Sequence, residues 1–305
     1  MVNPIVDRST RRRVGGDRLK DYLALLKPRV MSLVVFTALV GLMLAPGSLH
    51  PMVAVAALIC IAVGAGASGA INMWYDADID GQMPRTCERP IPRGNVTPRA
   101  ALIFGSVLSF ASVIAMAALV NLLSAGLLML TIAFYVFVYT MWLKRRTPQN
   151  IVIGGAAGAF PPMIGWAAAS GDISLASIAL FAIIFFWTPP HFWALALYKA
   201  DEYRDVGVPM LPVVAGKPAT RRQILIYTLI LIPLTLSPVA LGACGMAYGV
   251  GAVLLGGVFL AFAIQVWRGG DDDDRPARRL FGYSIFYLFA LFTLMLGERL
   301  AVGWV

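Results

Sequence analysis

Apolar runs of roughly twenty residues repeat along the whole chain and are separated by short polar stretches. A helix needs about 20 predominantly apolar residues to cross the hydrocarbon core of a bilayer. The pattern therefore predicts an all-α, polytopic membrane bundle of about nine transmembrane helices. Their expected ranges are 29–46, 52–73, 100–120, 122–143, 151–169, 175–198, 223–243, 246–267 and 280–300.

The composition supports one membrane domain preceded by a short tail. Of the 305 residues, 59% are hydrophobic and 13% are charged, so the spans leave no room for a soluble domain. We expect residues 1–25 to form a basic cytoplasmic tail and residues 26–305 to form a single transmembrane domain. The tail is rich in arginine, but it contains Asp7 and Asp17 and lacks the apolar core of a cleaved signal. A bacterial plasma membrane is the expected location.

The formal net charge of +9 would indicate a nucleic-acid partner in a soluble protein, but the distribution of the basic residues argues against one. Beyond the N-terminal tail, Lys and Arg are concentrated in the segments 74–99, 144–146, 199–222 and 268–279. The alternate loops have none, and Arg299 at the end of the last span is the only exception. This positive-inside pattern predicts a cytoplasmic N-terminus and an outer C-terminus. No nucleic-acid partner is expected.

An acidic row closes the second span. Asn72, Asp76 and Asp80 are each four residues apart, so in a helix they share one face, whereas Asp78 points to the opposite side. Oxygen ligands of this kind suit Mg²⁺, which usually takes one or two carboxylates together with substrate phosphates. The alternative is a helix end that frays into water, where carboxylates need no partner.

A second acidic row at an equivalent place favours the metal site. The sixth span ends in Asp201 and Asp205, again four apart. Each row is followed by two prolines and then by a Gly, a Pro and an Arg that lead into the next span. This order predicts a four-span unit used twice in the same orientation, with the ninth span left over. Both rows would then converge on an active-site cavity at the cytoplasmic side, and two solvated loop starts are the alternative.

Basic residues expected at the same face complement the acidic rows. Arg85 and Arg89 lie in the first acidic loop, and Lys144 and Arg145 follow the fourth span. Arg binds phosphate oxygens through a planar fork, and Lys binds them as a point charge. These residues therefore indicate an anionic, phosphate-bearing substrate. Taken singly, each of them is also what the positive-inside pattern alone would place there.

His191 is an ionisable residue inside the sixth span, directly after Pro189 and Pro190. The two prolines predict a kink that frees backbone carbonyls. Two interpretations stay open at this point. One is a histidine that is hydrogen-bonded at the kink, and the other is a ligand or acid–base group that faces the cavity.

Three further features are expected to carry no chemistry. The glycines of Gly154–Gly158 lie inside a span and indicate close helix packing, not a phosphate loop. The run Asp271–Asp274 indicates a solvated linker. The cysteines fit no metal-binding spacing, and we expect Cys60, Cys87 and Cys244 to be free thiols.

At these residues the chain resembles the intramembrane aromatic prenyltransferases of the UbiA superfamily, and within them the branch that acts on haem. The acidic motif NMWYDADID from Asn72 indicates the superfamily. The branch is indicated by LKRRTPQNIVIGGAAGA from Leu143 and TPPHFWALAL from Thr188. Other matching stretches are LKPRVMSLVVFT from Leu26, RPIPRG from Arg89 and DVGVPMLPVVAG from Asp205. The resemblance covers nearly all of 20–300.

The resemblance implies farnesyl transfer from farnesyl diphosphate to a vinyl group of haem b, which gives haem O. Mg²⁺ would assist ionisation of the diphosphate, and the vinyl carbon would attack the allylic cation. The implied metal ligands are Asn72, Asp76, Asp80, Asp201 and Asp205. The implied catalytic residues are Asp76, Asp80, Asp201 and Lys144. The implied substrate-binding residues are Lys27, Arg29, Arg85, Arg89, Tyr139, Arg145, His191, Tyr198 and Lys199.

The chemistry suggests further roles around this site. The allylic cation needs a dry cavity, and aromatic rings can face it. The candidate rings are Trp74, Tyr135, Tyr139 and Trp187. Membrane lipid surrounds the bundle, and the candidate partners for handover of the product are haem A synthase and terminal-oxidase assembly factors.

Two alternatives compete with this interpretation. A sister prenyltransferase that acts on a quinone precursor or on chlorophyllide would have the same acidic rows and a different acceptor pocket. A transporter of an anionic lipid or a metal would usually place its charged site near the midplane on interrupted helices. Here the acids are expected at the helix ends, which favours the enzyme.

Overall fold

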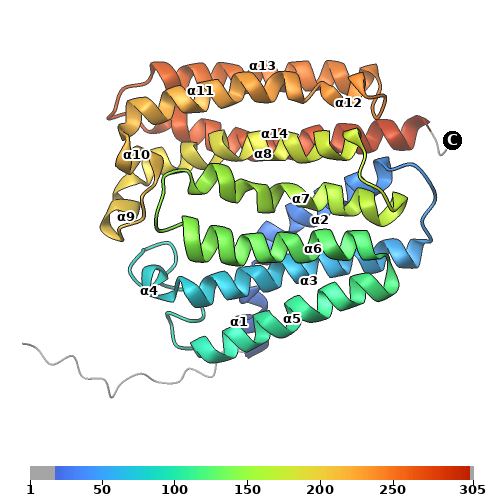
Figure 1. The fold of residues 1–305 in the computed structure, drawn as a ribbon. Coiled ribbons are helices and arrows are strands. Elements are labelled where there is room, and N and C mark those ends of the chain that lie inside the picture. The colour runs from blue at the N-terminus through green and yellow to red at the C-terminus, as the bar shows by residue number, and fades with distance from the viewer. Residues whose placement is uncertain (1–17, 303–305) are drawn as a thin grey trace, which may run out of the picture.

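The computed structural model describes residues 18–302, and in that range it contains helices joined by turns and loops (Figure 1). Eight of the described helices are long and apolar enough to cross a membrane, or nine if the bent pair α1–α2 is counted as one span. The expected all-α bundle of about nine spans is confirmed. The elements are α1 Arg18–Leu25, α2 Pro28–Leu44, α3 Pro51–Tyr75, α4 Ala77–Asp80, α5 Pro98–Leu119, α6 Leu122–Ala133, η2 Phe134–Leu143, α7 Asn150–Ser170, α8 Leu175–Tyr198, α9 Ala200–Asp205, α10 Leu211–Val214, α11 Gly216–Leu234, α12 Ser237–Ala240, α13 Met246–Arg268 and α14 Arg275–Val302.

Two units of four spans follow one another, as the order of motifs predicts. In the first unit α2 packs on α3, α3 on α5 and α5 on α6. In the second unit α7 packs on α8, α8 on α11 and α11 on α13, so the neighbours repeat in the same order. The last helix, α14, packs on α13, α8 and α2 and thereby joins the second unit to the first.

The first helices of the two units, α2 and α7, cross at a pair of glycines. A Cβ atom added to Gly41 of α2 would lie 2.0 Å from the carbonyl oxygen of Pro162 on α7. One added to Gly165 of α7 would lie 2.0 Å from the carbonyl oxygen of Ala38 on α2. The two backbones therefore touch where only glycine fits, which is a common way for membrane helices to pack closely.

Polar caps and prolines set where the spans begin. Three of them start at an N-cap side chain that accepts a hydrogen bond from the amide three residues on, at Thr97, Asn121 and Ser174. Proline occupies the first helical position at Pro51 and Pro98, where its missing N–H costs nothing. These short caps keep the loops between spans compact.

The fourth span changes its winding halfway along. It begins as α6 and continues as η2, a π-helix in which each amide bonds to the carbonyl five residues earlier. The last such bond joins the Lys144 amide to the Tyr139 carbonyl at 2.9 Å. Residues five apart therefore share a face, and η2 leads directly into the basic segment that follows.

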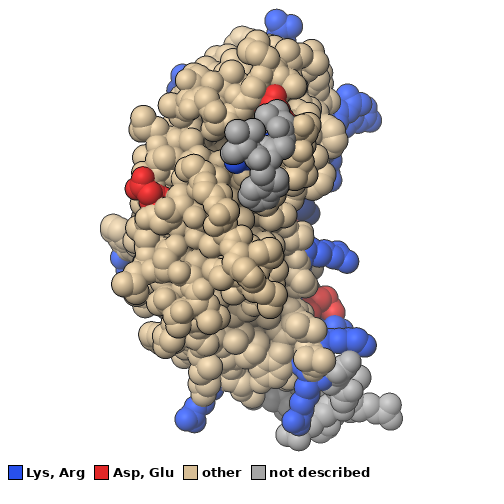
Figure 2. Space-filling model, turned by 90° about the vertical axis from the view of Figure 1, so that its right-hand side faces the viewer, with Lys and Arg blue, Asp and Glu red and all other residues tan. Residues whose placement is uncertain are grey.

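The two ends of the bundle differ in charge. The short helices α4, α9 and α10 lie together at one end, at the left of Figure 1, with the connections that carry most Lys and Arg. We call this the charged end. Figure 2 looks onto the opposite end, where the surface is almost free of charged side chains and the basic ones project at its margins. The cysteines Cys60, Cys87 and Cys244 are free, as expected.

The topology predicts that labels at the two ends report opposite sides of the membrane. Asp172 follows α7 at the end opposite the charged end, and Gly270 lies in the α13–α14 loop at the charged end; both are exposed. In a chain whose three cysteines are replaced by alanine, Asp172→Cys and Gly270→Cys should react with a membrane-impermeant maleimide from opposite sides. Asp172 is preferred to Gly171, whose φ of 71° disfavours a side chain. Labelling of both from the same side would contradict the nine-span topology.

Candidate active site

The first acidic row forms a buried cluster at the charged end. α3 ends at Tyr75, and Asp76 joins it to the short helix α4, so the row stays on one face. Asn72, Asp76 and Asp80 are all buried, and Asp76 is 0% exposed. The Asn72 side-chain amide donates to Asp76 Oδ2 at 2.7 Å. Carboxylates that are removed from water in this way need a cation beside them.

Three basic side chains from different elements surround the row. Lys144, which follows η2, forms an ion pair with Asp76. Arg89, in the loop after α4, donates to Asp80 Oδ2 at 2.6 Å. Lys27, between α1 and α2, donates to Asn72 Oδ1 at 3.0 Å. These three basic side chains outnumber the two carboxylates, an arrangement that suits the binding of a diphosphate.

Lys27 is held in an uncommon backbone conformation. Its φ of 52° and ψ of 56° are left-handed, and it is the one non-glycine residue with a positive φ in the described chain. This conformation produces the 49° bend between α1 and α2 and turns the chain back over α3. A strained residue whose side chain reaches the acidic row is a feature of functional sites.

Arg145 binds residues within and beside the first acidic row and so helps to hold it in place. Its guanidinium binds both carboxylate oxygens of Asp78, at 2.7 and 2.8 Å, and donates to the Tyr75 carbonyl at 3.0 Å. The same group lies 3.4 Å from Asp76 Oδ1. Its hydrogen bonds hold the pKa of Asp78 below the usual value for an aspartate. Asp78 is exposed and faces away from Asn72, as the spacing predicts.

Thr140 is a member of the site that the sequence analysis missed. Its buried hydroxyl accepts a hydrogen bond from the Asn72 amide at 3.2 Å. Thr140 follows Tyr139 on η2, and its inward position depends on the π-helical winding, which apolar periodicity does not reveal. The sequence therefore gives no signal that would have identified it.

Two tyrosines of η2 line the same region. The rings of Tyr135 and Tyr139 lie 5.3 Å apart between centroids. Tyr139 packs on Gly154 of α7, where an added Cβ atom would lie 2.1 Å from the ring. The expected packing role is therefore confirmed for Gly154, and for Gly155, which packs on Thr188 of α8, whereas Gly158 is exposed and packs on nothing. Trp74 packs instead in the cluster that contains Leu25, away from η2.

The second acidic row does not reach the first. Asp201 has an 86% exposed side chain and pairs with Arg204 at 2.5 Å. Asp205 is also exposed, and Lys199 pairs with Glu202. Among the described residues, no group of three or more His, Cys, Asp or Glu side chains is placed to hold one metal ion. The metal role of Asp201 and Asp205 stays a prediction.

The loops that carry the two rows nevertheless dock on each other. Ile79 and Met83 of the first loop pack in one cluster with Tyr203 and Met210 of the second. Arg85 donates to the Tyr203 hydroxyl at 3.2 Å and lies over its ring. The expected convergence of the two loops is thus present, but tyrosine, not aspartate, faces the first loop.

Two expected substrate-binding residues lie apart from the cluster. Arg29 is exposed in the first turn of α2. Tyr198, at the end of α8, is half-buried, and the Arg278 guanidinium lies 4.5 Å from the centroid of its ring. Neither residue contacts the first acidic row.

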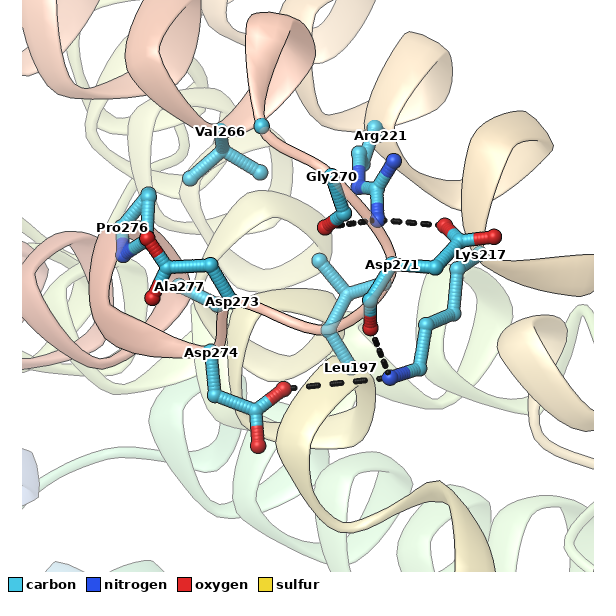
Figure 3. Close-up of a pocket in the computed structure, with 11 residues that line it drawn as sticks. Leu197, Lys217, Arg221, Val266, Gly270, Asp271, Asp273, Asp274, Pro276 and Ala277 are labelled. Carbon is cyan, nitrogen blue, oxygen red and sulfur yellow. Dashed lines mark hydrogen bonds and ion pairs between the residues drawn. The ribbon is translucent and has the colours of Figure 1, made fainter.

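The Asp271–Asp274 loop is anchored to α11. Arg221 donates to the Asp271 carboxylate and to the Gly270 carbonyl, both at 2.6 Å, and Lys217 donates to the Asp271 carbonyl at 2.8 Å (Figure 3). The cavity between these groups is about 10 Å³, which is room for at most one water molecule. The run is exposed, as expected of a linker, and it also fastens the α13–α14 loop to the bundle.

His191 is a buried side chain in the middle of an aromatic stack. Its ring lies between Trp187 and Phe281, with centroid distances of 4.4 and 4.7 Å. Its Nδ1 lies 2.7 Å from the hydroxyl of Ser284 on α14. The Ser284 hydroxyl donates to the Phe281 carbonyl at 2.6 Å, so it accepts from Nδ1, and Nε2 keeps its lone pair. The partner of His191 is therefore a side chain, not a carbonyl freed by the prolines.

The donors of the first row suit Mg²⁺. Asp76 and Asp80 present two buried carboxylates from consecutive turns, with the amide oxygen of Asn72 beside them. Magnesium sites in proteins commonly use one or two carboxylates and complete their shell with water and substrate phosphates. The residues present therefore fit a cation that is shared with a diphosphate.

Comparison with known proteins settles the family. The model of the UbiA prenyltransferase family matches residues 34–290. The chain belongs to the UbiA prenyltransferase family. A protoheme IX farnesyltransferase of Parvibaculum lavamentivorans is 62% identical over 288 residues, which cover 94% of this chain and 91% of that protein. A protein of the same name from Azorhizobium caulinodans is 62% identical over 286 residues, which cover 93% of each chain.

Solved structures share the fold of this UbiA prenyltransferase. A structure of digeranylgeranylglyceryl phosphate synthase has a TM-score of 0.78 at 15% identity and covers 93% of this chain and 99% of its own. A UbiA homolog from Archaeoglobus fulgidus bound to GPP and Mg²⁺ has a TM-score of 0.61 at 17% identity and covers 90% and 99%. The expectation of a prenyltransferase is confirmed, and the transporter alternative is set aside.

Proposed function

We propose that this prenyltransferase transfers the farnesyl group of farnesyl diphosphate to a vinyl group of haem b and so forms haem O. The name of relatives at 62% identity supports the acceptor and the prenyl group. The buried pair Asp76 and Asp80, surrounded by Lys27, Arg89 and Lys144, is the observation that carries the donor half. A site with this charge pattern binds a diphosphate together with a divalent cation.

The acidic row and the basic side chains around it would have different roles at the diphosphate. Asp76 and Asp80, with Asn72, would hold Mg²⁺, which supplies charge neutralisation of the leaving diphosphate when bound. Lys144 and Arg89 would exchange their carboxylate partners for phosphate oxygens and stabilise the negative charge that develops there. Both cations already lie at the site, so binding of the diphosphate requires only that they change partners there.

The prenyl chain and the acceptor need a dry environment. The C1–oxygen bond of farnesyl diphosphate breaks, and the diphosphate departs with the electron pair. Tyr135 and Tyr139 would present their ring faces to the allylic cation and exclude water from it. The terminal vinyl carbon of haem b would then attack C1 and leave a cation on the neighbouring carbon. Water would add there and lose a proton to solvent, which gives the hydroxyethylfarnesyl side chain.

His191 would bind the acceptor. Ser284 fixes the imidazole with its proton on Nδ1, which leaves the Nε2 lone pair for haem iron. Trp187 and Phe281 hold the ring from both sides. His191 lies seven residues before the end of α8 at Tyr198, which is about 10 Å at the helical rise. A porphyrin bound to His191 would therefore lie on the membrane side of the charged end, where the diphosphate would bind.

The direct test supplies the substrates to membranes that contain the protein. Membranes incubated with haem b, farnesyl diphosphate and Mg²⁺ should form haem O, detected by mass spectrometry. Parallel reactions with a quinone precursor or chlorophyllide as acceptor address the sister enzymes. Product from one of those acceptors, and none from haem b, would overturn the proposed acceptor and leave the prenyl transfer intact.

The His191→Ala variant is expected to weaken haem binding and shift the haem absorption spectrum, since haem iron takes imidazole readily. The affinity for farnesyl diphosphate should stay near that of the wild type, because His191 makes no contact with the acidic row. Titration of purified protein with haem, followed by absorbance, measures the first effect. An unchanged spectrum with lower thermal stability would show that His191 serves packing alone.

The second acidic row makes a separate prediction. If Asp201 joins the metal site, Asp201→Asn should lower turnover about tenfold at limiting Mg²⁺, and excess Mg²⁺ should restore part of it. Asp205→Asn should act in the same direction. Turnover is measured over a range of Mg²⁺ concentrations. A change below twofold at every concentration would remove both residues from the metal site.

We also propose a cellular setting that follows from the charge pattern. The charged end would face the cytoplasm of a bacterial inner membrane, with the N-terminus inside and the C-terminus outside. Haem A synthase or oxidase assembly factors would take over the product.

A further inference from the structure

Arg299 is the one Lys or Arg side chain at the end of the bundle opposite the charged end, among the residues that the structure describes. It lies in the last turn of α14 and is half-buried. Its Nε donates to the carbonyl oxygen of Met43 in α2 at 3.3 Å. That bond orients the guanidinium. Its two Nη groups remain available to bind a phosphate.

The acidic side chains at this end are engaged elsewhere. Glu298 accepts hydrogen bonds from the amides of Gly245 and Tyr248, at 2.6 and 3.2 Å, and so caps the start of α13. Asp172 accepts from the Ile173 amide at 2.7 Å within its own turn. No ion pair involves Arg299 within residues 18–302, so among these residues its charge has no carboxylate partner.

The guanidinium borders an open pocket of about 780 Å³. That volume lies within the range of small-ligand sites, roughly 300–1,000 Å³. Three connections and the end of α14 enclose the pocket, so it lies between the two four-span units. Its walls are mostly apolar and include Leu44, Trp166, Leu175 and Leu241. A pocket with one cationic side chain and apolar walls is suited to an amphiphile whose anionic head group pairs with the cation and whose hydrocarbon part contacts the walls.

The apolar lining of the pocket continues onto exposed apolar side chains. Leu175 and Leu241 line it and are 69% and 42% exposed, so an acyl chain can leave the pocket along α8 and α12 without meeting a charge. A zwitterionic head group would also bring an ammonium group, and Glu298, the carboxylate next to Arg299 in the chain, already accepts two backbone amides. An anionic head group has no such penalty, and a lone guanidinium favours it.

We propose that this pocket is a binding site for an anionic glycerophospholipid of the adjacent leaflet, with its phosphate on Arg299. The site is independent of the prenyl-transfer site, which lies at the other end of the bundle. A lipid in this position would contact α2, α8 and the α12–α13 loop at once and would stabilise the junction of the two units.

The test compares lipids with identical acyl chains on purified full-length protein. Phosphatidylglycerol should bind and raise the melting temperature more than phosphatidylethanolamine does, followed by native mass spectrometry and thermal unfolding. Arg299→Gln should weaken phosphatidylglycerol binding about tenfold. Arg299→Lys should retain part of it. Arg279→Gln removes an exposed arginine from the charged end of the same helix and should leave binding within twofold.

Equal retention of phosphatidylglycerol by wild type and Arg299→Gln would overturn the proposal, and so would equal binding of the two lipids by the wild type. Inorganic phosphate that stabilises the protein as well as the lipid does would show an ion site and overturn the lipid assignment. If Arg299→Gln does not fold, Ala176→Trp decides, because it fills the pocket and keeps the charge. It should also lose the lipid, and unchanged binding in that variant contradicts the site.

Discussion

Asp76→Asn and Asp80→Asn should each lower farnesyl transfer by ~10³-fold or more while the protein still inserts and folds. Asparagine keeps the size of the side chain and removes its charge. Each substitution therefore takes away one of the two buried carboxylates that fit Mg²⁺ and leaves Lys27, Arg89 and Lys144 with one counter-charge fewer. Turnover of farnesyl diphosphate at saturating Mg²⁺ is the measurement, with the melting temperature as the check on folding.

Matched controls test whether the loss of activity is specific to Asp76 and Asp80 or follows the removal of any aspartate. Asp273→Asn changes an exposed carboxylate that accepts from the Arg275 amide at 3.0 Å, and it should leave turnover unchanged. Asp78→Asn changes an exposed neighbour of the row that is paired with Arg145, and its effect should stay within a few-fold. Full activity in both Asp76→Asn and Asp80→Asn would remove the first row from the chemistry.

The spans and the repeat were accessible from the sequence because membrane thickness fixes the length of each apolar run. The expected first span, 29–46, corresponds to α2 at Pro28–Leu44. The seventh is expected at 223–243, but the candidate span already begins at Gly216 and runs to Ala240, with a break after Leu234. Its first turns are polar and still helical, so hydropathy alone places the start too late.

The first acidic row was predictable, whereas its surroundings were not. Spacing by four places Asn72, Asp76 and Asp80 on one face, and the structure keeps them there. The same rule applied to Asp201 and Asp205 says that they share a face of α9, but not where that face points. Docking of the loops by Tyr203 turns it outward, and such tertiary contacts leave no periodic signal in the sequence.

The sequence also does not reveal two irregular backbone conformations at the site. A left-handed Lys27 and a π-helical η2 are local departures from the regular dihedrals that periodicity assumes. Both of them deliver a side chain to Asn72, the first through Lys27 itself and the second through Thr140. The site therefore depends on two irregular segments that pattern analysis treats as ordinary helix or loop.

The crossing of α2 and α7 gives the second large expected effect: Gly165→Ala should strongly destabilise the protein. The added Cβ atom would lie 2.0 Å from the Ala38 carbonyl oxygen and 3.1 Å from the Leu42 amide nitrogen. Both are backbone atoms, so no side-chain rotation relieves the overlap, and the two helices must move apart. Overpacking of a tight interface costs about 1–3 kcal/mol or more. Because α2 begins beside Lys27, the shift should also reach the active site and lower turnover.

Gly158→Ala on the same helix is the matched control for Gly165→Ala. Gly158 is exposed, and a Cβ atom added there meets nothing within 4 Å. Alanine is a better helix former than glycine by about 1 kcal/mol, so this variant should be neutral or slightly more stable. The melting temperatures of both variants, measured in the same detergent, compare the two sites directly. Equal melting temperatures would mean that α2 and α7 tolerate separation, and the close glycine contact would then not hold the two four-span units together.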